Sequence, residues 1–216
     1  MATEIYTKAD RYLAYLKKLL QSEFNRYFLL GFDELNVVRV KREASGTYSS
    51  IDEAARNRML IVAKEAYEQA AKEVWGSEYE TDVRNLPNSD WLNKVLKQYN
   101  RTTGYLYDTE LDRKRLRYQE QVLTAREFQD RVMYNDSIKK AAALLWMQIS
   151  QYMISTVDEA RIKAFKDFGV KNVIWHTMKD GKACEDCDAN NGKQFDIDNL
   201  PSKHYGCRCY LTPVVN

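Results

Sequence analysis

The chain has 216 residues, of which 44% are hydrophobic and 30% charged, and its formal net charge is +2. This is typical of a soluble protein with one or two domains and a sizeable core. So small a net charge does not by itself indicate a nucleic-acid-binding protein. The longest nearly apolar stretch, residues 141–154, contains Gln148, Ser150 and Gln151, so we expect no membrane span. The N-terminus shows no signal segment, so we expect synthesis in a reducing cytoplasm.

Residues 1–100 are expected to form an N-terminal helical region. Apolar residues recur every three or four positions from about Thr3 to Leu30. This spacing predicts a long helix that either joins a bundle or extends beyond its own domain. The basic, β-branched run 36–42 is expected to be a loop or a short extended segment, and Ser45-Gly46 predicts a turn.

A second helix of this region is expected behind a capping box. Ser50 and Glu53 are spaced so that each can satisfy a free backbone group at a helix start, and the apolar spacing behind them continues to about Trp75. A polar connector over residues 77–88 then leads to a short helix at 91–99.

Residues 101–169 are predicted to be a second helical part, which follows a break at Arg101–Gly104. Three polar clusters resemble helix starts and divide this part into several helices. These clusters are Thr124–Glu127, Asn135–Ser137 and Thr156–Glu159. The predicted helices span residues 105–123, 138–154 and 156–168, with Gly169 after the last of them.

The pattern changes after Gly169, where residues 170–216 are expected to form a small β module. Strand-like runs occur at residues 170–177, 194–197 and 209–215, separated by turns at Asp180-Gly181 and Asn191-Gly192. The predicted fold class is therefore mainly α: a body of long helices with a small C-terminal β and metal-binding module.

All four cysteines lie in this module, which indicates a local site rather than cysteines scattered through a core. The candidate ligands are Cys184, Cys187, His204, Cys207 and Cys209. A Cys-x-x-Cys turn can place two thiolates at two corners of a zinc tetrahedron, and the His-x-x-Cys-x-Cys segment offers three more donors. Five donors for four positions leave two ligand sets open: four thiolates, or three thiolates with the His204 imidazole. We predict a closed, structural Zn²⁺ site.

Disulfide bonds and free thiols are the alternatives to a metal. Four cysteines permit three disulfide pairings, which an oxidising compartment would favour. The absence of a signal segment and a chain long enough to build its own core both favour the metal.

The C-terminal motifs resemble those of the tailed-phage head morphogenesis proteins, also called minor head or minor capsid proteins. The resemblance covers roughly residues 100–216. It is carried by the run Thr156-Val-Asp-Glu-Ala-Arg161, then Gly169, Trp175, Asp180, Cys184-x-x-Cys187, Asn191-Gly192-Lys193, Pro201 and His204-x-x-Cys-Arg-Cys209. Many relatives have proline after the histidine, whereas this chain has Tyr205-Gly206, a difference that bears on the ligand set.

The resemblance implies an assembly protein of the phage head that acts at the portal vertex in head morphogenesis and in DNA packaging or delivery. The implied partners are the portal protein, the major capsid or scaffolding protein and packaged DNA, with several copies per head and no membrane. The implied locations are the virion and, during assembly, the host cytoplasm.

An enzyme is the first alternative, and the sequence does not favour it. His176 is the only histidine besides His204, and no phosphate-binding glycine loop or nucleophile motif is present. The acids around the first cysteine pair are typical of a solvated face. We therefore expect no catalytic residues.

A zinc-ribbon protein that binds DNA without a role in the virion is the second alternative. Among residues 179–216 acidic side chains outnumber basic ones by one, so the metal module is not the basic part of the chain. The candidate phosphate contacts lie in the helical body. They are Arg39, Lys41, Arg42, Arg113, Lys114, Arg115 and Arg117.

Overall fold

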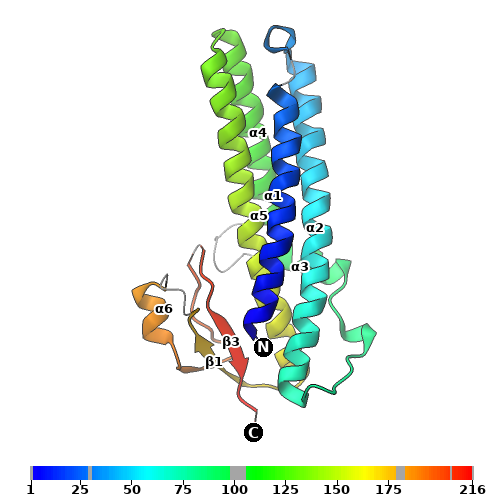
Figure 1. Ribbon diagram of the computed structural model, residues 1–216, viewed down its shortest axis with the longest axis vertical. Coiled ribbons are helices and arrows are strands. Elements are labelled where there is room, and N and C mark those ends of the chain that lie inside the picture. The colour runs from blue at the N-terminus through cyan, green and yellow to red at the C-terminus, as the bar shows by residue number, and fades with distance from the viewer. Residues whose placement is uncertain (1, 29–30, 98–105, 179–182, 205, 216) are drawn as a thin grey trace.

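The computed structural model describes residues 2–28, 31–97, 106–178, 183–204 and 206–215, and shows a long helical bundle with a small sheet at its base (Figure 1). The bundle helices are α1 (Ala2–Phe28), α2 (Val37–Trp75), α4 (Tyr107–Glu127) and α5 (Arg131–Asp167). They alternate in direction along the bundle. At 1.5 Å per residue, the 39 residues of α2 span about 58 Å.

Short elements join these helices or lie in the C-terminal module. They are the 3₁₀ turns η1 (Phe32–Glu34) and η2 (Val83–Asn85) and the helices α3 (Ser89–Lys97) and α6 (Glu185–Asn190). The strands β1 (Asn172–His176), β2 (Gln194–Asp196) and β3 (Tyr210–Pro213) form an antiparallel sheet in the order β2-β1-β3. This arrangement confirms the predicted fold class of a mainly helical body with a small C-terminal β module. The first predicted helix is a member of the bundle.

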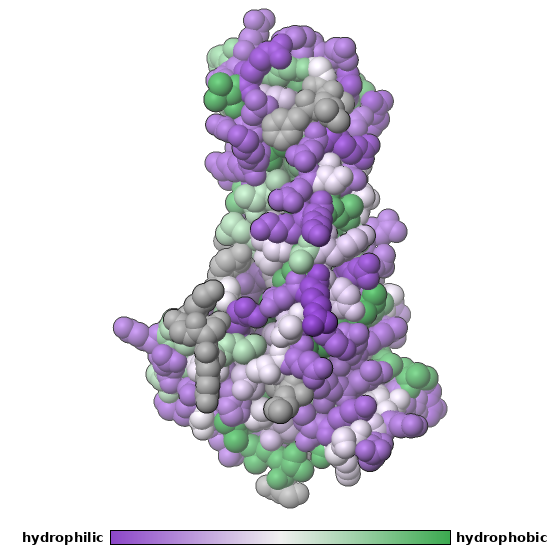
Figure 2. All heavy atoms as spheres, viewed as in Figure 1, coloured by the Kyte–Doolittle hydropathy of each residue, from purple (hydrophilic) through white to green (hydrophobic). Residues whose placement is uncertain are grey.

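The bundle core is aromatic and aliphatic and draws on all four long helices. Phe24, Tyr27, Tyr48 and Tyr118 form one group of rings within it, with centroid separations of 5.4–6.3 Å. Aromatic pairs with such offset or edge-on geometry add to the stabilisation from burial. Hydrophilic residues cover most of the bundle face shown in Figure 2.

Three long helices run through positions that the sequence marked as helix boundaries. The turn at Ser45-Gly46 and the capping box at Ser50–Glu53 lie inside α2, and the predicted loop at 36–42 forms the N-cap and first residues of that helix. The clusters at Asn135–Ser137 and Thr156–Glu159 lie inside α5, and Thr124 lies inside α4. These boundary predictions were wrong.

The physical reason is visible in the hydroxyl groups of α5. Ser137 Oγ donates to the Met133 carbonyl at 2.7 Å, and Thr156 Oγ1 donates to the Tyr152 carbonyl at 2.8 Å. Each hydroxyl is thus satisfied four residues back within the helix instead of capping a new one. The helix start is capped by Asp130, whose side chain accepts from the Met133 N–H.

The three predicted strands are confirmed with shorter bounds, but α6 was expected only as a turn. The predicted ends at Leu30 and Tyr99, the break at Arg101–Gly104, the helix start at Tyr105 and the turn at Asp180-Gly181 lie outside the described residues. No helix among the described residues is both long and apolar enough to cross a membrane.

A second apolar cluster connects the sheet to the end of the bundle. Val173, Trp175 and Leu211 on one face of the sheet pack with Phe165 of α5 and Tyr67 of α2. Buried cysteines of the module belong to the same cluster. The buried candidate ligands Cys187, Cys207 and Cys209 therefore belong to the apolar cluster that joins the sheet to the base of the bundle.

Candidate metal centre

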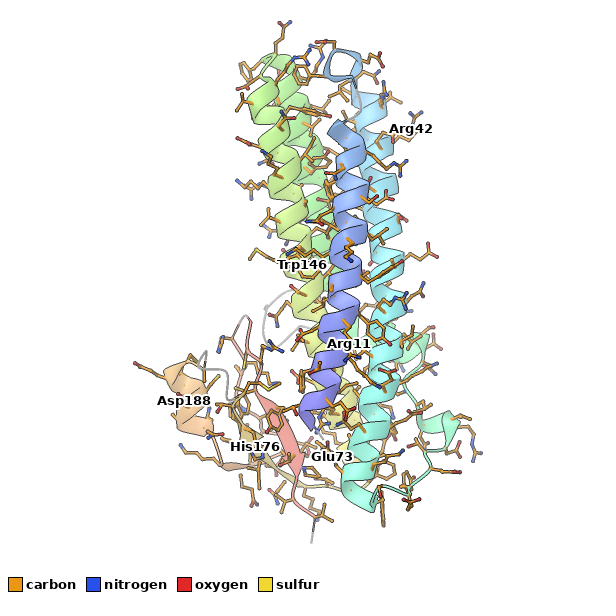
Figure 3. All side chains as sticks on the ribbon, in the orientation of Figure 1. Arg11, Arg42, Glu73, Trp146, His176 and Asp188 are labelled. Carbon is orange, nitrogen blue, oxygen red and sulfur yellow. The ribbon has the colours of Figure 1, made fainter. Side chains whose placement is uncertain are left out.

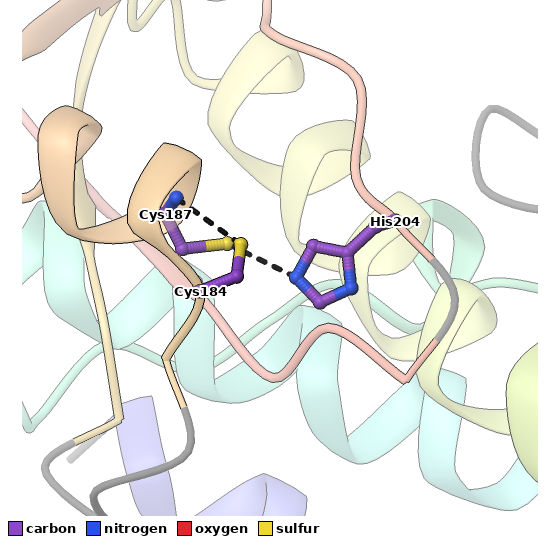
Figure 4. A group of neighbouring side chains, drawn as sticks. All are labelled: Cys184, Cys187 and His204. Atoms are coloured by element: carbon purple, nitrogen blue, oxygen red, sulfur yellow. Dashed lines mark hydrogen bonds between the residues drawn. The ribbon is translucent and has the colours of Figure 1, made fainter.

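The five predicted donors converge on Cys187. Its sulfur lies 3.3 Å from His204 Nε2 and 3.7 Å from Cys207 Sγ. Donor atoms of Cys184, Cys187 and His204 all lie within 4.8 Å of one another, and so do those of Cys187, Cys207 and Cys209. Figure 4 shows the first of these groups, with the His204 ring directed at the two sulfur atoms.

Local backbone structure brings these donors together. Cys184 is the N-cap of α6, and its sulfur accepts the Cys187 N–H at 3.4 Å. On the other side, Gly206 adopts a φ of +74°, a left-handed conformation that glycine adopts without strain. The resulting turn places the Cys207 N–H 3.1 Å from the His204 carbonyl. A cavity of about 70 Å³ lies among Cys187, His204, Cys207 and Cys209.

The donor set fits a tetrahedral metal ion. With Zn–S and Zn–N bonds of about 2.3 and 2.1 Å, a tetrahedron separates two sulfurs by about 3.8 Å and a sulfur from a nitrogen by about 3.6 Å. The distances from Cys187 to Cys207 and to His204 are close to these values. All four cysteines are free thiols, three of them buried. The cluster can therefore hold a metal ion.

The thiols perturb one another strongly. Hydrogen bonding from the Cys209 thiol lowers the pKa of Cys207 to about 5. Burial raises the pKa of Cys187 to about 12, and hydrogen bonding to Cys207 raises the pKa of Cys209. Without a cation this buried group can hold one thiolate but not three, since each further negative charge would lie unpaired next to the first. A divalent ion removes that restriction.

The surroundings of the ligands contain polar residues that the cysteine spacing does not indicate. Lys203 precedes His204 and forms an ion pair with Asp158 of α5, with Nζ 2.7 Å from Oδ2. Gln151 of α5 accepts the Gly206 N–H at 2.8 Å. Asp158 belongs to the run Thr156–Arg161 that contributes to the family resemblance. This run was the one sequence signal that could have indicated Asp158, but its pattern was interpreted only as a helix start.

The predicted nucleic-acid-binding residues lie in the body, away from this centre. Their two groups, from α2 and α4, are adjacent: Gln119 donates to the Lys41 carbonyl and Arg115 to Ser45 Oγ, both at 3.4 Å. Figure 3 marks Arg42 near the end of the bundle opposite the sheet. Most of these cations have acidic partners nearby. The pairs are Arg39–Glu34, Arg42–Glu43, Arg113–Glu110, Lys114–Glu110 and Arg115–Asp112.

His176 is part of the sheet rather than of the metal cluster. Its ring stacks on Tyr210 at 5.1 Å, and its Nε2 lies 2.8 Å from Thr212 Oγ1. Burial lowers the pKa of His176. The three residues share one face of the sheet, so a packing role accounts for this histidine.

The chain matches a known protein family. Neither the curated proteins nor the solved structures contain a match to the chain. Residues 92–212, more than half of the chain, match the family described as Phage Mu protein F like protein. The matched region contains α4, α5, the sheet up to residue 212 and all five candidate ligands. The chain therefore belongs to the Phage Mu protein F like family of phage head proteins.

Proposed function

We propose that this protein is a minor head protein that acts at the portal vertex during phage head assembly and in packaging or delivery of the DNA. The family match over residues 92–212 is the observation that carries this proposal. A long bundle with a compact module at its base also suits a protein that bridges larger partners, because its two ends present different surfaces. The proposed partners are the portal protein, the major capsid or scaffolding protein and packaged DNA.

The proposed role is recognition and positioning without catalysis. Its C-terminal module would be clamped by a structural Zn²⁺, to which Cys187, Cys207 and Cys209 supply three ligands. The fourth ligand would come from Cys184 or His204, each of which lies within 4.8 Å of Cys187. When bound, the ion neutralises the thiolates and fixes the loop segments that carry them.

Mass spectrometry of purified heads and mature virions tests the assembly role. We expect this chain in several copies per head, in a fixed ratio to the portal protein, and in host cytoplasm while heads assemble. Its absence from both particles would contradict a role in the virion.

Metal analysis tests the zinc site separately. Protein purified under reducing conditions should contain about one equivalent of zinc. A content below about half an equivalent would rule out the site. Comparison of Cys184→Ser with His204→Ala identifies the fourth ligand, because only loss of the true ligand should lower the zinc content.

A zinc-ribbon protein that binds DNA outside the virion is the second candidate. The adjacency of the basic segments of α2 and α4 favours it, since the two together form one surface. The ion pairs of these cations with acidic side chains reduce the attraction of that surface for the phosphates of DNA. Titration with duplex DNA at several salt concentrations tests the idea, because phosphate contacts make affinity fall steeply with salt. Binding that does not depend on salt would exclude phosphate contacts.

A further inference from the structure

The segment that carries Cys207 and Cys209 is attached to helix α5 through its backbone. The Gly206 N–H donates to Gln151 Oε1 at 2.8 Å, directly before the ligand Cys207. Gln151 is only 5% exposed. This hydrogen bond fixes the turn between His204 and Cys207.

A second attachment lies beside Cys209. Lys203 Nζ donates to Asp158 Oδ2 at 2.7 Å and to the Cys209 carbonyl at 2.5 Å. The Tyr6 hydroxyl of α1 donates to the other Asp158 oxygen at 2.5 Å. The Lys203 and Asp158 side chains are each 12% exposed. Asp158 is thus held from one side by α1 while it holds Lys203 on the other.

The two attachment residues are separated by about two turns of helix α5. Gln151 and Asp158 are seven residues apart, or about two turns, so both project from one face of α5. The other half of the centre has a different support. Near α6 the Gly192 N–H donates to the Trp175 carbonyl at 2.7 Å, and the Thr177 N–H donates to Asn191 Oδ1 at 3.0 Å. One pair of cysteines is therefore carried by the sheet and the other is fastened to the bundle.

We propose that Gln151 and Asp158 are positioning residues of the metal centre, which hold Cys207 and Cys209 in place for the ion. This inference rests on the proposed metal site and adds residues outside its ligand set. Polar groups around a metal's ligands commonly change its affinity by about 10–100-fold. Here the mechanism is preorganisation: a segment that is already ordered loses less conformational entropy when the ion binds.

Zinc affinity of the full-length chain, measured by competition with a chromogenic chelator, tests the proposal. Gln151→Leu removes the acceptor for the Gly206 N–H while it keeps an apolar side chain of similar size. We expect its affinity to fall about tenfold or more. Gln151→Asn keeps an amide acceptor without adding a buried charge and should lose less affinity than Gln151→Leu.

Gln148→Leu is the matched control. Gln148 is also buried in α5, but its Nε2 donates to the Tyr107 carbonyl of α4 at 3.0 Å. This variant should lose stability without a change in zinc affinity. A purely structural role for Gln151 would instead make the two leucine variants behave alike.

Tyr6→Phe examines the Asp158 attachment with the smallest change. The ring stays and only the hydrogen bond to Asp158 is lost, so we expect a modest fall in zinc affinity. In the Asp158→Asn variant, the same Tyr6→Phe change should have no further effect on zinc affinity. Spectra of the Co²⁺-substituted protein report separately on whether the thiolate ligands are all engaged. Wild-type protein that binds zinc no more tightly than Gln151→Leu and Tyr6→Phe would overturn the positioning role. Wild-type protein that binds no zinc would overturn the metal centre itself.

Discussion

Arg161 is a charged residue buried where α5, α2 and β3 meet, and it is only 1% exposed. Its guanidinium donates to both Glu73 oxygens, at 3.1 and 2.6 Å, and to the Leu211 carbonyl at 2.8 Å. It thereby satisfies an outer backbone group of the edge strand β3, where Pro213 offers no N–H. Arg161 thus links the bundle to the sheet.

Arg161→Met should destabilise the protein by about 3 kcal/mol, because it removes one partner of a buried pair and leaves Glu73 and the Leu211 carbonyl unsatisfied. Urea denaturation measures the effect. Arg84→Met is the control: Arg84 pairs with Asp82, but its side chain is 86% exposed, so no measurable change is expected. Equal effects of the two substitutions would show that the buried contacts of Arg161 contribute nothing.

Glu110 gives a pH-dependent prediction. Burial alone would raise its pKa, but hydrogen bonds from Arg113 and Lys114 outweigh burial, and the net pKa lies below its ordinary value. A carboxylate with a lowered pKa stabilises the fold fully above its unfolded value of about 4.3, and this contribution is lost as the pH falls through the folded value. Glu110→Gln should therefore be less stable than wild type at pH 7, and the difference should shrink below about pH 4.

Free energies of unfolding at several pH values measure this difference. Asp112→Asn is the control on the same helix, since Asp112 pairs with Arg115 while 67% exposed. A constant difference between wild type and Glu110→Gln from pH 7 to pH 3 would contradict the assignment.

At the scale of elements, the sequence indicates the helical stripes, the strands and the clustering of the metal ligands, because these depend on local spacing. It does not indicate where α2 and α5 begin, because the decisive contacts are tertiary. Val40, Ala44 and Tyr48 are buried on one face of α2, and their packing carries the helix through Ser45-Gly46. The positions of Gln151 and Asp158 relative to the cysteines likewise appear only once the chain has folded.

Gly46 therefore provides a test at this scale. A Cβ at this position would meet nothing within 4 Å, and glycine in a helix interior costs about 0.5–1 kcal/mol relative to alanine. Gly46→Ala should stabilise the protein by about that amount in urea denaturation. Gly169→Ala should do the opposite, because Gly169 has a φ of +76°, which alanine adopts only with strain. A destabilising Gly46→Ala would favour the turn that the sequence pattern indicates.

At the scale of the whole molecule, we expect the packing of the two apolar clusters to depend on the metal to different degrees. The bundle cluster is built mainly from the four long helices. The basal cluster contains Trp175 together with Cys187, Cys207 and Cys209, so its packing adjoins the metal ligands directly. Metal binding should thus control the order of the base while the bundle keeps its own core.

Removal of the metal with a chelator should leave most of the far-ultraviolet helical signal at 20 °C, because the bundle cluster does not include the ligands. It should change the fluorescence of Trp175, which belongs to the basal cluster and is 1% exposed. Trp175→Phe identifies the source of that change, since Trp75, Trp91 and Trp146 remain. Re-addition of zinc should restore the signal. Collapse of the helical signal on chelation would show instead that the bundle folds only with its metal-bound base, so that body and module form one cooperative unit.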